Sequence, residues 1–242
     1  LYGRGSADDG YSIFSAVTAV KALQTCGIPH PRIVILIETC EESGSWDLSH
    51  YLDSCKKQIG RPDLVICLDS GCGDYERLWV TTSLRGAIVG ELEVKMLRQD
   101  IHAGTSGMVA SSFRVMRRIL DRIEDARTGA VRIDDFYCPV PELRKEQIRE
   151  TAGIIEKGLL AALPMFKDAV PVSNDPVELI TNSTWKPAVS YIGADGIPPV
   201  GSAGNVIRQA TRLLLSIRTP PLVETDVPVK KLKKTMEANP PY

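Results

Sequence analysis

Helical and strand-like patterns alternate along the first third of the chain. Apolar residues recur at helical spacing over residues 9–26, and a second helical stretch covers residues 46–57. Between and after them, residues 33–37 and 63–69 form continuous apolar runs, which are typical of strands buried on both faces. The alternation predicts an α/β fold with a mostly parallel sheet and flanking helices.

The pattern changes after residue 78. Residues 87–96 alternate apolar and polar side chains, which indicates a half-exposed strand. Further helices and strands follow in mixed order, so we predict a smaller α+β domain over residues 84–218. Residues 1–83 would form the first α/β part, and residues 219–242 would return to it. The expected later elements are helices at 109–126, 141–163 and 223–238, and strands at 188–193 and 205–217.

Composition and charge narrow the class of partner. The chain has 242 residues and a formal net charge of −1, which argues against nucleic acid as a partner. A membrane is also not expected, because no apolar run reaches the roughly 18 to 20 residues that cross a bilayer. Six scattered cysteines, without a C-x-x-C pair, fit reduced thiols and a cytoplasmic location. A small molecule is the expected partner.

Acidic residues stand at the ends of several predicted elements: Asp8, the pair Glu41 and Glu42, and Asp69. Right-handed crossovers would bring such ends to one edge of a sheet. Each position also has an ordinary interpretation, since Asp8 can cap the following helix and the glutamates can be solvated. Together they would suit a zinc site, and one glutamate left off the metal would deprotonate a bound water.

Two later positions are candidates for binding groups. His102 lies in a polar loop with glycines, where it can be a metal ligand or a hydrogen-bond donor to an oxyanion. His30 and His50 fit ordinary exposed histidines. Asn205 and Arg218 stand at the two ends of a strand pair, where the guanidinium can clamp a carboxylate or simply be exposed.

Six segments, taken in order, resemble the dinuclear zinc metallopeptidase family of carnosine dipeptidases, glutamate carboxypeptidases, aminoacylase and acetylornithine deacylases. They cover nearly the whole chain and read YGRGSADDG, ETCEESGS, LDS, TTSLRG, DIHAGTSG and NVIRQATRLLLSIRTPP. The resemblance implies a hydrolase that cleaves a peptide or amide bond next to a free carboxylate, of dipeptidase or carboxypeptidase type. An N-acyl amino acid is the alternative substrate.

The resemblance also implies roles for the candidate residues. Asp8 would bridge two zinc ions, for which manganese or cobalt could substitute, while Glu42 and Asp69 would each bind one ion. Glu41 would be the general base. In the smaller domain, which is a lid and dimerisation domain in the family, His102 would reach the active site of a second chain in a homodimer. Asn205 and Arg218 would contact the carboxylate end of the substrate.

The chain departs from the family pattern at several points. Gly10 replaces the lysine after the aspartate pair, Ala103 a serine, Met108 a glycine and Arg208 a proline. The two histidine ligands of the family have no counterpart in the chain. We therefore expect an internal fragment of a dipeptidase-like member, inactive alone; a catalytically silent dimerisation module is the other interpretation.

Overall fold

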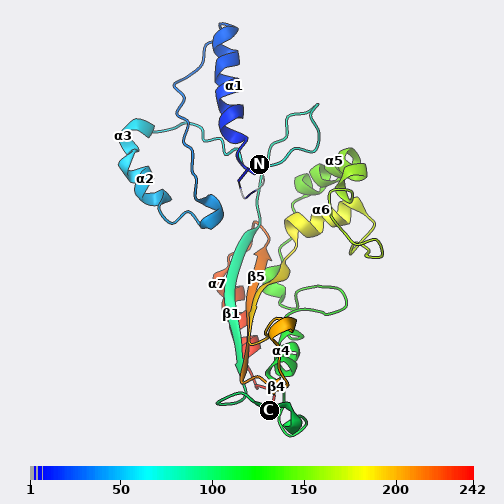
Figure 1. The fold of residues 1–242 in the computed structure, drawn as a ribbon. Coiled ribbons are helices and arrows are strands. Elements are labelled where there is room, and N and C mark those ends of the chain that lie inside the picture. Colours follow the sequence, from blue (N-terminus) through cyan, green and yellow to red (C-terminus); the bar gives the residue numbers. More distant parts are fainter. Residues whose placement is uncertain (1–2, 4, 7) are drawn as a thin grey trace. The chain divides into compact units, whose positions relative to one another are not determined.

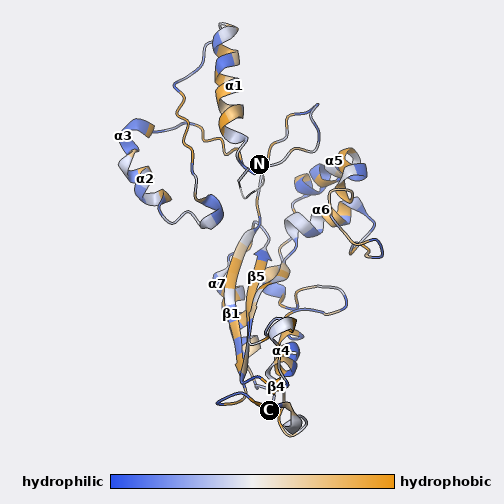
Figure 2. Ribbon diagram, in the orientation of Figure 1, coloured by the Kyte–Doolittle hydropathy of each residue, from blue (hydrophilic) through white to orange (hydrophobic). Residues whose placement is uncertain are grey.

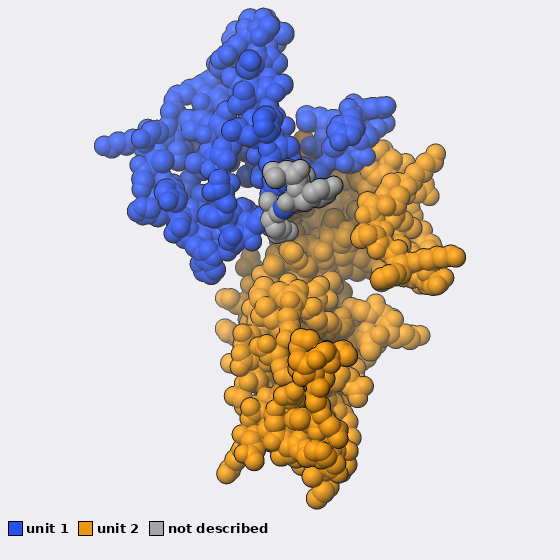
Figure 3. All heavy atoms as spheres, in the orientation of Figure 1, with its two compact units in different colours: residues 1–79 blue, residues 80–242 orange. Residues whose placement is uncertain are grey.

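The computed structural model describes residues 3, 5, 6 and 8–242. The chain folds as two compact units, Leu1–Trp79 and Val80–Tyr242 (Figure 3). This division lies four residues before the one predicted at 83/84. Residues 219–242 belong to the second unit, whereas the sequence assigned them to the first part; the roles of the parts stay a prediction.

Helices dominate the described residues of the first unit. They are α1 (Ser12–Thr25), the 3-10 helix η1 (Glu41–Ser43), α2 (Leu48–Ser54) and α3 (Lys56–Ile59) (Figure 1). Gly27 stops α1 two residues after its last helical residue, with a φ of +66° that suits glycine. Ile28 N–H then donates to Leu23 O at 2.9 Å. The helices predicted over 9–26 and 46–57 are therefore confirmed, the second as two short helices.

The predicted mostly parallel sheet is wrong. No strand forms among the described residues of the first unit, and residues 33–37 and 63–69 run as irregular chain. Their apolar side chains remain exposed, Ile35 at 43 % and Ile66 at 72 %. An apolar run identifies a segment suited to a buried strand, but a strand also needs hydrogen bonds from a neighbouring strand. Among these residues no such neighbour lies beside either run.

The second unit contains an antiparallel three-stranded sheet. Its order is β1 (Gly86–Lys95), β5 (Ala210–Thr219) and β3 (Ala188–Asp195), with β5 in the middle. Ile88 pairs with Ile217 and Leu92 with Leu213, so the apolar faces of β1 and β5 coincide. Both strands are largely apolar in Figure 2. A separate antiparallel pair joins β2 (Ile101–His102) to β4 (Val206–Ile207).

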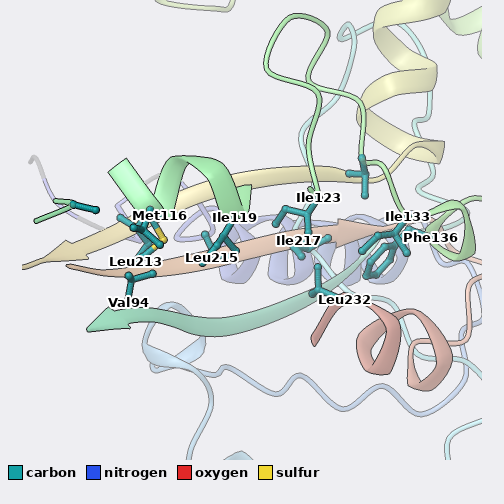
Figure 4. Close-up of a cluster of buried hydrophobic side chains, with 13 residues drawn as sticks. Val94, Met116, Ile119, Ile123, Ile133, Phe136, Leu213, Leu215, Ile217 and Leu232 are labelled. Carbon is teal, nitrogen blue, oxygen red and sulfur yellow. The ribbon is translucent and has the colours of Figure 1, made fainter. Parts of the chain in front are cut away.

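The core of the second unit lies between this sheet and its helices. α4 (Ser112–Leu120) packs against β1 and β5, and α7 (Asp226–Glu237) contributes Leu232 to the same cluster (Figure 4). Met116 and Phe136 are fully buried there. Arg122 fixes the end of α7, because its guanidinium donates to the carbonyls of Thr235 and Met236, each at 3.2 Å.

A helical pair forms a second cluster. α5 (Glu142–Leu159) and α6 (Pro176–Trp185) bury Ile148, Ala152, Ile180 and Trp185 between them. α6 was not predicted, although Asp175 followed by Pro176 is a strong helix start: Asp175 Oδ1 accepts from Val177 N–H at 2.9 Å. Three 3-10 helices complete the described elements of this unit: η2 (Ala103–Thr105), η3 (Asp134–Phe136) and η4 (Val200–Ser202).

None of the helices in the described part of the chain has the length and apolar character needed to cross a bilayer.

Candidate functional site

The structure brings Asp8 and Asp69 together in the first unit. The two carboxyl groups lie close enough to affect one another's charge. The pKa of Asp69 is raised, first by loss of hydration, then by the charges of Asp8 and Asp9 and by hydrogen bonding of the protonated Asp69 to Asp8. Two of the carboxylates predicted to meet therefore do meet.

A tight glycine turn presents Asp8. Gly10 N–H donates to Gly5 O at 3.0 Å, and Gly5 has a φ of +72°. A Cβ at position 10 would lie 2.5 Å from Gly5 O, so any side chain there would displace the turn. In this structure the turn therefore favours glycine at position 10.

Glu41 and Glu42 begin the 3-10 helix η1 and are exposed. Gly44, with a φ of +103°, closes this helix, and its N–H donates to Glu41 O at 2.8 Å. The nearby Glu38 accepts a hydrogen bond from the Cys40 thiol at 3.5 Å. Loss of hydration and this bond raise the pKa of Cys40. Glu38, which is not among the candidate site residues, thus has a partner within its own segment.

The donor set fits the carboxylate half of a divalent-metal site. When two carboxylates lie close together, as Asp8 and Asp69 do, a shared proton or a bound cation relieves the repulsion between their charges. Carboxylate oxygens are also common zinc ligands. Within residues 3, 5, 6 and 8–242, however, no three His, Cys, Asp or Glu side chains are grouped to hold a metal ion. Glu42 is not brought into such a group, and its assignment as a ligand stays a prediction.

His102 ends β2 in the second unit and is exposed. Its Nδ1 accepts a hydrogen bond from Gly104 N–H at 3.1 Å. The neutral ring therefore carries its proton on Nε2, which is free to donate. A Cβ on Gly104 would lie 2.9 Å from Nδ1, so glycine is what allows this close approach.

Asn205 lies beside the histidine loop. Its backbone carbonyl oxygen accepts from Ala103 N–H at 2.9 Å, next to the pairing of His102 with Val206. The same loop is held by Asp100, which accepts from Gln209 N–H and from Arg208, both at 2.8 Å. The hydrogen bond from Gln209 and the one from Arg208 lower the pKa of Asp100. The sequence noted Arg208 only as a departure, but here it anchors the loop.

Arg218 lies near the opposite end of β5. It is exposed and is paired in register with Ala87 on β1 and Ala188 on β3. Ala210, where β5 begins after the histidine loop, is eight residues away. At about 3.4 Å per residue the separation is about 27 Å. Asn205 therefore lies before the strand pair β4 and β5, at the histidine loop, whereas Arg218 lies near the far end of β5.

Arg85 was not predicted as a site residue. Its guanidinium donates to the carbonyls of Asn182 and Lys186, at 3.3 and 3.1 Å, at the end of α6. Burial and the positive charge of Arg218 lower its pKa. Two guanidinium groups are thus close together at this end of the sheet. The TTSLRG segment contains Arg85, but its pattern does not reveal the proximity to Arg218.

Comparisons with known proteins agree over nearly the whole chain. It is 27 % identical over 241 residues to a probable di- and tripeptidase, DUG2 of Saccharomyces cerevisiae, covering 98 % of this chain and 26 % of that protein. It is 25 % identical over 244 residues to the human β-Ala-His dipeptidase, covering 98 % and 47 %. The chain thus spans about half the length of these curated relatives, or less.

Solved structures share the fold. The Sulfolobus solfataricus metallo-carboxypeptidase Sso-CP2 superposes with a TM-score of 0.73 at 18 % identity, covering 98 % of this chain and 53 % of that one. The dipeptidase Dug1p of Saccharomyces cerevisiae gives 0.69 at 21 % identity, covering 98 % and 50 %. The model of peptidase family M20/M25/M40 matches residues 1–238, and the chain belongs to this family.

Proposed function

We propose that the chain is part of a metal-dependent hydrolase that cleaves a peptide bond next to a free carboxylate. The observation that carries the proposal is the meeting of Asp8 and Asp69, which come from distant segments and form a carboxylate pair suited to a cation. Membership of a peptidase family supports the same reaction class.

Three carboxylates would hold the metal ions, with Asp8 between the two ions, Glu42 on one and Asp69 on the other. Zinc is the proposed metal, with manganese or cobalt as substitutes. A bound metal ion would act as a Lewis acid and lower the pKa of a water molecule bound to it. Glu41, the first residue of the 3-10 helix η1, would be the general base that takes the proton of this water.

His102 is the proposed donor to the oxyanion of the reacting carbonyl. Its Nδ1 accepts from Gly104 N–H, so the neutral ring has Nε2–H left as a donor. An exposed donor at the end of a two-residue strand is available to a substrate, including one held by a second chain.

The spacing within the second unit supports a homodimer. Arg218 lies about 27 Å along β5 from Ala210, and Asn205 precedes that strand, at the histidine loop. A dipeptide extends about 7 Å, so the two groups of one unit cannot contact the same dipeptide. Contact with one substrate from both ends requires a second copy of the chain, which we propose binds through residues 80–242.

The alternative substrate is an N-acyl amino acid, which shares the free carboxylate. The names of the relatives favour a dipeptide, since they specify di- and tripeptides or β-Ala-His. A silent association module remains the third candidate. A cytoplasmic location stays a prediction; the six cysteines are free, as reduced thiols would be.

A substrate panel tests the proposal on the whole protein. After chelation and addition of zinc, manganese or cobalt, we expect hydrolysis of dipeptides and weak or no hydrolysis of their C-terminal amides. N-acetyl amino acids in the same assay separate the deacylase alternative. Failure to cleave any of these substrates would favour the silent module.

The general base is tested by Glu41→Gln, with Glu38→Gln as the matched control. We expect Glu41→Gln to lower kcat by a factor of about 100 to 10,000, because the proton of the attacking water loses its acceptor. Glu38→Gln should keep kcat. Equal turnover of wild type and Glu41→Gln would contradict the role of Glu41.

A further inference from the structure

The side chain of Tyr11 connects two distant segments of the first unit. Its hydroxyl donates to Ser70 O at 3.0 Å and accepts from Ser70 N–H at 3.2 Å. Ser70 directly follows Asp69 in the chain. Both backbone groups of this residue are therefore held by one side chain, which fixes the orientation of the adjoining peptide as well as its position.

Tyr11 is itself tied to the segment that carries Asp8. Ser12 N–H donates to Asp9 O at 2.9 Å, and Ser15 N–H donates to Tyr11 O at 3.0 Å in the first turn of α1. The glycine turn before it is closed by the bond from Gly10 N–H to Gly5 O. The tyrosine ring thus projects from a short hydrogen-bonded segment that begins with the acid pair.

When both are ionised, the two carboxylates repel one another and do not hold this arrangement by themselves. Asp69 faces the like charges of Asp8 and Asp9, which repel it when ionised. A hydroxyl bonded to the main chain of Ser70 is unaffected by that repulsion, since neither partner carries a charge. It can keep the Asp69 carboxylate near Asp8 before any cation is bound.

We propose that Tyr11 is a positioning residue that holds Asp69 close to Asp8, so that a divalent cation can bind both. The inference rests on the proposed function, because it assigns to Tyr11 the preorganisation of two of its metal ligands. Groups that orient the ligands of a metal affect affinity strongly, and their loss typically costs about 10-fold to 100-fold.

The test is Tyr11→Phe in the whole protein, which keeps the ring and removes the hydroxyl. Tyr51→Phe is the matched control, since Tyr51 lies on α2 of the same unit and is 58 % exposed. The metal-free proteins are titrated with Zn²⁺ and with Co²⁺. We expect Tyr11→Phe to bind about 10-fold to 100-fold more weakly and Tyr51→Phe to bind as wild type does.

Two further measurements separate positioning from a general structural role. In the metal-free protein the Ser70 amide should exchange with solvent faster in Tyr11→Phe, while the amides of α1 exchange as in wild type. At saturating metal, kcat of Tyr11→Phe should return close to that of wild type, because all ligands and Glu41 are still present.

Asp69→Asn serves as the reference variant. If Asp69→Asn weakens metal binding and Tyr11→Phe does not, the inference about Tyr11 is wrong and the proposed function stands. If neither substitution changes metal binding, the assigned metal site is wrong, and the inference with it. A Tyr11→Phe variant that is unfolded, or that has the same affinity loss as Tyr51→Phe, would also contradict a positioning role.

Discussion

Asp8 and Asp69 lie close enough that the charge of Asp8 raises the pKa of Asp69, although one precedes α1 and the other follows α3 in the chain. Neither strand expected to carry the acids to a common edge is formed in the described residues. Instead, a bond from Gly10 N–H to Gly5 O closes the turn around Asp8, and the Tyr11 hydroxyl bonds to the backbone of Ser70, next to Asp69. Turns and this side-chain bond, rather than strands, are what the structure shows around the two acids.

Gly104 controls the orientation of His102. A methyl group at position 104 would lie 2.9 Å from His102 Nδ1, so Gly104→Ala should turn the ring away and remove its bond to the loop N–H. If Nε2 stabilises an oxyanion, kcat should fall by about 100-fold to 1,000-fold, approaching the loss in His102→Ala. Steady-state kinetics of both variants measure this.

The control for that substitution is Gly201→Ala. A Cβ at position 201 meets no atom within 4 Å, and the residue is exposed. Gly201→Ala should therefore retain kcat. The double variant Gly104→Ala/His102→Ala should be no worse than His102→Ala alone, and additive losses would show that Gly104 acts by another route.

Mixing two inactive variants tests the exchange of His102 between chains. In a dimer, a His102→Ala chain and an Arg218→Ala chain would form one intact site per heterodimer, with Arg218 from one chain and His102 from the other. Random mixing makes about half the dimers heterodimers, so about a quarter of wild-type activity should return. No recovery after subunit exchange would place His102 and Arg218 in the site of their own chain, and a monomer in sedimentation would exclude the dimer.

The histidine loop should loosen in acid. Hydrogen bonds from Gln209 and Arg208 depress the pKa of Asp100, so its stabilising contribution is present above the ordinary aspartate pKa near 4. That contribution is lost as the pH falls through the lower folded-state pKa. The protection of the Gln209 amide against exchange should therefore drop on acidification in wild type.

Asp100→Asn provides the comparison, because the amide keeps an acceptor for Gln209 N–H but has no charge to lose. Its protection should be lower near neutral pH and should change less on acidification. Parallel curves for the two proteins would mean that Asp100 does not contribute to the acid sensitivity.

Much of the fold could be predicted where neighbouring residues in the sequence determine the helix or strand. The apolar face of β1, with Ile88 and Leu92, follows from strict alternation, and α1 follows from helical spacing that stops at Gly27. α6 was not predicted, although Asp175 and Pro176 form a local signal for the start of a helix. These elements depend on neighbours in sequence, which is what a pattern contains.

The parallel sheet could not be predicted correctly for the same reason. Residues such as Ile35 and Ile66 fit a buried strand, but a strand needs a partner strand, which can come from a distant part of the sequence.

The candidate site could likewise be predicted only in part. The identities of Asp8 and Asp69 were accessible from their motifs, whereas the Tyr11 bonds to Ser70 join residues whose types suggest no contact. Distance in sequence hides such contacts.

Metal affinity of the acid pair is the most direct measurement of the central claim. The whole protein, freed of metal, is titrated calorimetrically with Zn²⁺ beside Asp8→Asn and Asp69→Asn, with Asp63→Asn as a matched control outside the pair. The account predicts that both pair variants bind at least about 10-fold more weakly, because each removes a charged oxygen ligand, while Asp63→Asn binds as wild type does. Unchanged Zn²⁺ affinity in Asp8→Asn and Asp69→Asn would contradict it.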